Sequence, residues 1–125
     1  MSIEQMAQDF TKAVAAENPD GYKRYWADDI VSLEPGDGDM SRCEGREALE
    51  AKHDWWNANT QVHSSKTEGP FVFGDQFAVR YEMDVTMDGE RSQMTEVGLY
   101  TVRDGKIAEE RFLYGTADGV SDSTG

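Results

Sequence analysis

Three carboxylates in segments that alternate between apolar and polar residues are the first candidates for chemistry: Asp84, Glu96 and Glu110. Alternate side chains of a strand point to the same face, so Glu96 shares a face with Tyr100. Glu110 likewise shares a face with Phe112. Burial among apolar groups disfavours a charged carboxylate and raises its pKa toward the range of a useful general acid or base. The pattern predicts that Asp84, Glu96 and Glu110 are catalytic residues.

Asp84 is the first choice among the three because it lies near a strand end, beside Thr86. It belongs, with Arg80 and Glu82, to the charged side of an alternating segment. The alternative is that this side is a solvated outer face, which is ordinary for a sheet with one wet side. A catalytic role for Asp84 requires a bulge or the mouth of a pocket to turn its side chain inward.

Glu96 and Glu110 have an alternative of their own. Arg91 and Arg111 lie in the same two segments, and an ion pair across a strand ladder would give either carboxylate a purely structural role. Their aromatic neighbours favour a pocket instead, because burying an acid is costly unless it is paired or protonated.

Aromatic side chains and a histidine are the candidates for ligand contacts. His53 falls one position off the apolar stripe of its segment, which would place it at the rim of a pocket. Aromatic walls with a few polar groups are typical of small-molecule sites, although the same residues are also common in cores. The predicted ligand-binding residues are Trp26, His53, Trp56, Tyr100, Phe112 and Tyr114.

Metal and cofactor sites are not expected. The two histidines, His53 and His63, lack the paired spacing of metal ligands. Cys43 is the only cysteine, which excludes an internal disulfide and any cysteine-based metal cluster. The EPGDGD stretch lacks the pattern of a phosphate-binding loop, and we expect it to be a flap over a pocket opening.

Length and charge restrict the partners. The 125 residues fit one domain, expected to span residues 1–115 and to be followed by a flexible tail at 116–125. Acidic residues outnumber Lys and Arg by 25 to 12, a net charge of −13, which disfavours nucleic acid and anionic membranes. The sequence shows no secretory signal and no apolar run of about 20 residues, so we expect a cytoplasmic protein.

Helical spacing dominates the first half of the chain. Ser2 and Gln5 resemble a capping box, and Asn18-Pro19 is a typical stop and restart. A loop rich in Gly and Asp follows a short strand. The expected elements are helices at about Ser2 to Glu17, Pro19 to Trp26 and Arg46 to Asn59, and a strand at Ile30 to Leu33.

The second half of the chain changes to a period of two, interrupted by turns at Gly74-Asp75, Asp88-Gly89 and Asp104-Gly105. Strands this long must bend, and bending around the helices leaves a pocket. The fold class is therefore α+β, with an antiparallel sheet packed on three helices. The expected strands are Val62 to Phe73, Gln76 to Met87, Glu90 to Arg103 and Lys106 to Tyr114.

This order of elements, with the runs GREALEAKHDWW, VHSSKTEGPFVFGDQFAVRYEMDVT and MTEVGLYTVRDGKIAEERFLYG, resembles the SnoaL-like branch of the nuclear transport factor 2-like superfamily. The resemblance implies a cone-shaped, strongly bent sheet that encloses a pocket. The superfamily hosts isomerases, cyclases, epoxide hydrolases and non-catalytic modules. Its cyclases and epoxide hydrolases place an aspartate near the end of the last strand, where this chain reads FLYG. The Arg-x-Asp pair of the epoxide hydrolases is matched only partly, by Arg80-Tyr81-Glu82 and Glu82-Met83-Asp84.

Two functions follow from the resemblance and the candidate residues. One is a cofactor-free isomerase, cyclase or hydrolase in which Asp84 or Glu96 takes a proton beside the carbonyl of a small apolar compound. Tyr100, Tyr114 or His53 would then donate a hydrogen bond to the enolate. The other is a non-catalytic ligand-binding or dimeric interaction module, since homodimers are common in this fold and the apolar outer residues Val97 and Leu99 suit such an interface.

Overall fold

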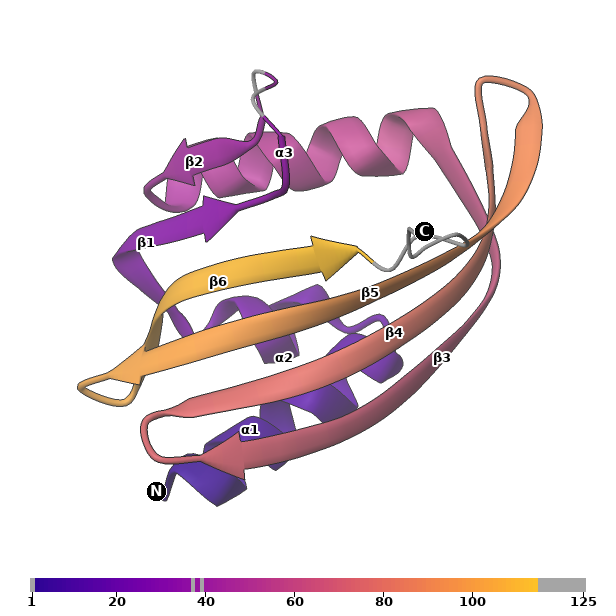
Figure 1. The fold of residues 1–125 in the computed structure, drawn as a ribbon. Helices are drawn as coiled ribbons and strands as arrows, with labels where there is room; N and C mark the ends of the chain where they lie inside the picture. Colours follow the sequence, from indigo (N-terminus) through magenta and orange to yellow (C-terminus); the bar gives the residue numbers. More distant parts are fainter. Residues whose placement is uncertain (1, 37, 39, 115–125) are drawn as a thin grey trace.

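The computed structural model describes residues 2–36, 38 and 40–114, so the predicted tail at 116–125 lies outside the described residues. The chain forms a curved sheet with the helices on its concave side (Figure 1). Within the described residues, no helix is long and apolar enough to cross a membrane. The elements are helices α1 (Ile3–Ala15), α2 (Pro19–Lys23) and α3 (Arg46–Asn59), and strands β1 (Trp26–Leu33), β2 (Arg42–Glu44), β3 (Thr60–Phe73), β4 (Gln76–Met87), β5 (Glu90–Arg103) and β6 (Lys106–Tyr114).

The sheet has the strand order β2-β1-β6-β5-β4-β3. Strands β3 to β6 form the expected antiparallel meander. The expectation of a wholly antiparallel sheet was wrong in one place, because β1 runs parallel to β6. No hairpin constrains this pair, since α3 and four other strands separate β1 from β6 in the chain, and its direction follows from tertiary packing.

Helix α1 begins as the sequence indicates. Ser2 is its N-cap and forms a reciprocal capping box with Gln5. Met6 and Phe10 of α1 are buried against the sheet, and the Phe10 ring meets the rings of Phe77 and Tyr100 edge-on. This contact is the centre of the core that holds α1 on the concave face.

Strand β1 is longer than expected and α2 is shorter. Helix α2 ends at Lys23, and Trp26 begins β1, where it pairs with Ile107 of β6. Tyr22 and Trp26 are spaced like neighbours on a helix, but pairing in the sheet overrides that local signal. The two rings still pack together, with centroids 6.2 Å apart. In the predicted loop, the three residues of β2 pair with β1.

The strand register decides which side chains reach the concave face. On β4 the apolar side is buried and faces the helices, whereas Arg80, Glu82 and Asp84 occupy the outer side. Across the ladders, Glu96 of β5 stands between Tyr81 of β4 and Tyr114 of β6. The alternation read from the sequence therefore places Glu96 on the inner face, as expected.

Candidate functional site

A chain of polar side chains crosses the inner face between β6, β1 and α3. The Glu110 side chain of β6 is buried, with only 3% of the residue exposed. The Ser32 hydroxyl donates to Glu110 Oε2 at 2.7 Å. Lys52 Nζ, from α3, donates in turn to Ser32 Oγ at 3.0 Å. Three elements distant in sequence thus meet in one hydrogen-bonded cluster.

Glu34, directly after β1, extends this cluster toward solvent. Its Oε2 atom lies 2.5 Å from Lys52 Nζ, and both side chains are largely buried, with 19% and 14% exposed. Glu34 also accepts a hydrogen bond from the Tyr114 hydroxyl. The Lys52 ammonium stands 5.2 Å from the centre of the Phe112 ring, close enough for a cation–π contact. Lys52 therefore contacts carboxylate, hydroxyl and aromatic groups at once.

The Glu96 side chain lies on the same face but makes no hydrogen bond or ion pair with any described residue. Burial, together with the charges of Glu34 and Glu110, raises its pKa from 4.5 to about 7, and the charge of Lys52 acts in the opposite direction. Glu96 is thus a partly buried carboxylate that exchanges its proton near neutral pH, which suits it to act as a general acid or base.

Glu110 is the deeper of the two strand carboxylates. Burial also raises its pKa, while the hydrogen bond from Ser32 and the charge of Lys52 act in the opposite direction. Because both of these partners are fixed within the cluster, Glu110 is held in place rather than open to a ligand. Its predicted inward orientation agrees with the structure.

Tyr81 and Tyr100 form a hydroxyl pair beside Glu96. Their oxygens are 2.7 Å apart, and both residues are buried. Burial raises the pKa of both hydroxyl groups, so they stay protonated. The hydrogen bond between them uses one of the two hydroxyl hydrogens, which leaves the second for a ligand oxygen.

Asp84 does not turn inward, and its expected orientation was wrong. It lies on the outer side of β4, where its carboxylate accepts two hydrogen bonds from Arg91 at 2.7 and 3.0 Å. These bonds lower its pKa. Arg80 pairs with Glu68 and Glu82 on the same side. The interpretation of this side as a solvated outer face is confirmed, because no bulge interrupts the pairing of Asp84 with β5.

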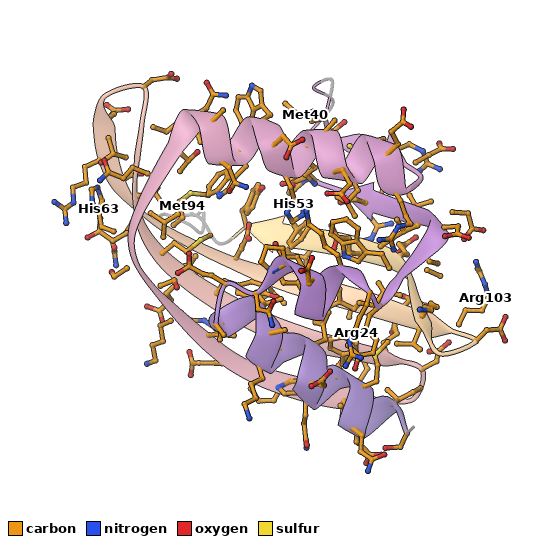
Figure 2. All side chains as sticks on the ribbon, turned by 180° about the vertical axis from the view of Figure 1, so that it is seen from behind. Arg24, Met40, His53, His63, Met94 and Arg103 are labelled. Atoms are coloured by element: carbon orange, nitrogen blue, oxygen red, sulfur yellow. The ribbon has the colours of Figure 1, made fainter. Side chains whose placement is uncertain are left out.

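His53 belongs to α3, and its side chain points from this helix toward α2 (Figure 2). Its ring centre is 5.2 Å from that of Trp26 and 6.1 Å from that of Tyr22. Burial, together with the charges of Lys23 and Lys52, lowers the pKa of His53 to about 4. At neutral pH the imidazole is therefore uncharged, in an aromatic cluster rather than at an open rim.

The remaining predicted ligand-binding residues differ in access. Trp26 and Tyr100 are each 2% exposed and belong to the core. Trp56 and Phe112 are half-buried, and Phe112 lies beneath the Lys52 ammonium. Tyr114 is 43% exposed and reaches the cluster through Glu34. The structure thus brings Phe112 and Tyr114 to the carboxylates and leaves Trp26 apart from them.

Four residues of the cluster were not among the predicted site residues: Ser32, Glu34, Lys52 and Tyr81. One of them carried a signal, because Lys52 falls within the apolar stripe of its helix, where a charged residue needs an inward partner. Glu34 stands in a loop-like acidic stretch and gives no such sign. Its role depends on how α3 packs over β1.

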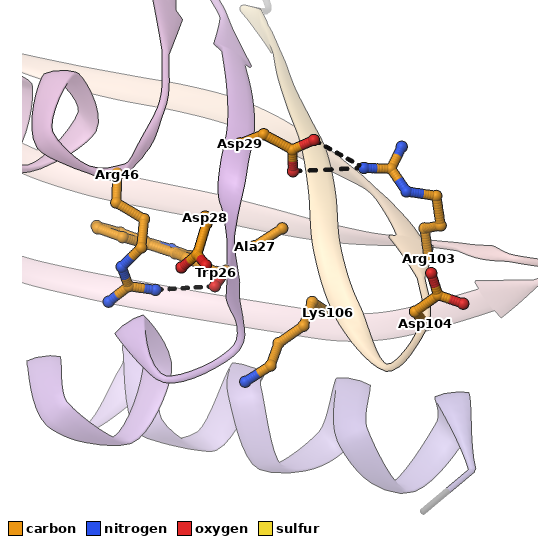
Figure 3. A pocket seen from close by; sticks show the side chains of 8 residues that line it. All are labelled: Trp26, Ala27, Asp28, Asp29, Arg46, Arg103, Asp104 and Lys106. Atoms are coloured by element: carbon orange, nitrogen blue, oxygen red, sulfur yellow. Dashed lines mark hydrogen bonds and ion pairs between the residues drawn. The ribbon is translucent and has the colours of Figure 1, made fainter.

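A pocket of about 340 Å³ opens elsewhere on the molecule, beside the first residues of β1 (Figure 3). Here β1 separates from β6, since the register between them shifts between Trp26 and Val31. Its three basic side chains are engaged: Arg103 pairs with Asp29, and Arg46 and Lys106 donate to backbone carbonyls. The pocket includes Trp26 but none of the inner carboxylates, and its lining is Trp26, Ala27, Asp28, Asp29, Arg46, Arg103, Asp104 and Lys106.

Comparison with known proteins places this arrangement in a family. A family model described as a SnoaL-like domain matches residues 1–114. A crystal structure from Mesorhizobium loti, described as a candidate SnoaL-like polyketide cyclase with carbohydrate phosphatase given beside it, is 49% identical with a TM-score of 0.87. The alignment covers 91% of this chain and 100% of that one. No protein of curated function matches the chain.

More distant structures share the fold alone. A nuclear transport factor 2-like protein from Burkholderia pseudomallei is 15% identical, with a TM-score of 0.73 over 96% of each chain. A protein from Catenulispora acidiphila with a ketosteroid isomerase-like fold, solved with trimethylamine, is 16% identical, with a TM-score of 0.69 over 90% of this chain and 87% of that one. The expected α+β fold of the nuclear transport factor 2-like type is confirmed.

Proposed function

Because the chain belongs to the SnoaL-like domain family, we propose that it binds a small, largely apolar carbonyl compound on its concave face, where Glu96 transfers a proton without a cofactor. The observation that carries this proposal is Glu96 itself. It is a largely buried carboxylate with a pKa of about 7 and no partner among the described residues. An acid in that state can take a proton at neutral pH and return it.

The neighbouring groups support proton abstraction next to a carbonyl. The Glu96 carboxylate would take the proton, and the electron pair would pass to the carbonyl oxygen as an enolate. The spare hydroxyl hydrogen of Tyr81 and Tyr100 would stabilise that oxygen. With a β,γ-unsaturated ketone, return of the proton at the γ carbon of the dienolate gives an isomerase. Attack of the enolate on a second carbonyl of the same molecule forms a carbon–carbon bond and an alkoxide, which takes the proton back from Glu96 and gives a cyclase.

This arrangement changes the roles first expected of three residues. Tyr100 acts through its pair with Tyr81, because its own hydroxyl is buried. Tyr114 donates to Glu34 and is engaged already. His53 packs between Trp26 and Tyr22, so it is assigned no contact with the enolate.

Native mass spectrometry combined with thermal unfolding tests the binding half of the proposal. We expect the purified protein to retain a small molecule or to gain melting temperature with neutral apolar ketones, because a ligand that binds only the folded state stabilises it. Anionic counterparts of the same shape should stabilise less, since Glu34, Glu96 and Glu110 face only Lys52. A protein that retains nothing and is not stabilised by any ketone would contradict the proposal.

The outer face of the sheet supports a homodimer as a second part of the proposal. Leu113 is 50% exposed and stands beside Val97 across the β5–β6 ladder. Leu99 adds a further apolar side chain on the same side of β5. An isologous contact through these residues would bury them in both copies. The same native spectrum gives the subunit count, and a monomer would rule this contact out without affecting the ligand site.

A further inference from the structure

Lys52 extends from α3 into the cluster, where its ammonium group makes two polar contacts. One contact is the ion pair with Glu34, at 2.5 Å. A second is the hydrogen bond to Ser32 Oγ, at 3.0 Å. An ammonium group has three hydrogens, so the two contacts fix its position and leave one hydrogen. The Phe112 ring lies beneath it and limits its movement.

These contacts divide the three inner carboxylates into two kinds. Glu34 is engaged by Lys52 directly. Glu110 is engaged through Ser32, whose hydroxyl receives the lysine hydrogen bond and passes its own hydrogen to the carboxylate. Glu96 receives neither contact and feels Lys52 only through its charge.

We infer that Lys52 is a positioning residue: it holds Glu34 and, through Ser32, Glu110, and so leaves Glu96 as the inner carboxylate that is free to exchange a proton with a ligand. The inference rests on the proposed function and adds a residue that controls which acid performs it. Lys52 also supplies the positive charge that lowers the pKa of Glu96, whereas the charges of Glu34 and Glu110 raise it.

The charges around Glu96 predict the direction in which its pKa should change when one of them is removed. Lys52 is the cation that lowers its pKa, whereas Glu34 and Glu110 raise it. Loss of the lysine charge must therefore raise the pKa of Glu96, and loss of the Glu34 charge must lower it. The titratable and charged groups around Glu96 are Glu34 after β1, Lys52 of α3, Tyr81 of β4, Tyr100 of β5, and Glu110 and Tyr114 of β6.

The experiment is a pH titration of the carboxyl ¹³C resonances of protein labelled at glutamate, followed by NMR in the absence of any ligand. In the unaltered protein we expect Glu96 to titrate near pH 7. In Lys52→Met its midpoint should rise by roughly one pH unit, as for the loss of an opposite charge nearby. In Glu34→Gln it should fall, and Lys52→Arg should restore the unaltered value.

Lys23→Met is the matched control. Lys23 also pairs with a glutamate at 2.5 Å, but its partner is Glu50, and the charges that act on Glu96 are those of Glu34, Lys52 and Glu110. This variant should leave the Glu96 midpoint unchanged. If the role of Lys52 were merely structural, Lys52→Met and Glu34→Gln would not shift the Glu96 midpoint in opposite directions.

An unchanged Glu96 midpoint in folded Lys52→Met would overturn the inference. If Lys52→Met does not fold, Glu34→Gln decides the question. A Glu96 midpoint that does not fall in Glu34→Gln would also overturn the inference. The titration needs no substrate. It can therefore fail while ketone binding persists, and the absence of ketone binding would leave the titration result standing.

Discussion

Glu96 and Glu110 stand on the same face of neighbouring strands, yet their partners give them different chemistry. Ser32 holds Glu110 at 2.7 Å, whereas Glu96 has no such donor among the described residues. Burial raises the pKa of both carboxylates, to about 7 for Glu96, and the hydrogen bond from Ser32 acts against this rise at Glu110 alone. The hydrogen bond from Ser32 thus distinguishes the carboxylate that is held in place from the one that we propose to be reactive.

The free energy of unfolding should depend on pH because of Glu96. Its pKa is about 7 in the folded protein and 4.5 ordinarily, so the folded state binds this proton more tightly. The stabilisation is complete below pH 4.5 and is lost as pH rises through 7, at most about 3 kcal/mol by linkage. Glu96→Gln has no proton to lose, so its stability relative to the unaltered protein should increase from pH 5 to pH 8 in urea unfolding.

Asp84→Asn is the control for this effect. Its carboxylate is ionised and paired with Arg91, so its removal should destabilise modestly at both pH values. If the difference between Glu96→Gln and the unaltered protein does not grow from pH 5 to pH 8, the high pKa of Glu96 is wrong.

Strand β5 is the element that positions the reactive groups, and Gly98 is the position that allows it to do so. A Cβ atom at Gly98 would lie 2.6 Å from the Tyr100 hydroxyl oxygen and 2.8 Å from Cζ. The Tyr100 ring folds over this glycine and stacks on Phe77, with centroids 4.9 Å apart. The absence of a side chain at Gly98 therefore sets the position of the hydroxyl pair.

Replacing Gly98 with alanine should displace the Tyr100 ring and break its hydrogen bond with Tyr81. We expect Gly98→Ala to lower the free energy of unfolding by about 1–3 kcal/mol, as for overpacking of a core. Thr95→Ala, on the outer side of the same strand, should cost less than about 1 kcal/mol. Chemical denaturation of both variants measures the difference, and equal losses would show that Tyr100 is not constrained by Gly98.

The strands β4, β5 and β6 could be predicted to the residue, because turns that contain Gly and Asp mark their ends and the sequence between the turns has a period close to two. The same alternation correctly placed Glu96 and Glu110 on the inner side. It did not locate the cluster, since the contacts of Lys52 with Glu34 and Ser32 depend on how α3 packs on β1. The expected inward turn of Asp84 needed a bulge in β4, but β4 pairs with β5 without interruption, and the bulge beside Asp84 lies on β3, between Val62 and Ser64.

At the scale of the whole molecule, the net charge of −13 and the inner cluster act in the same direction. Three carboxylates face one ammonium group on the concave side, so the interior as well as the surface disfavours an anionic ligand. The exposed apolar side chains are elsewhere, and Phe71, Phe73 and Leu113 are each at least half exposed. These surfaces support the proposal of a neutral ligand on the concave side and a second copy on the outer side.

The most direct test of the account is hydrogen–deuterium exchange at the carbon next to a ketone carbonyl, followed by NMR in D₂O. The probes are small apolar ketones, beginning with 2-tetralone. We predict that the unaltered protein accelerates exchange above buffer and that the rate rises with pH through about 7. Glu96→Gln should lose roughly 100-fold or more of that rate, and Asp84→Asn should keep it. Exchange that survives in Glu96→Gln, or that never exceeds the buffer rate, would contradict proton transfer by Glu96.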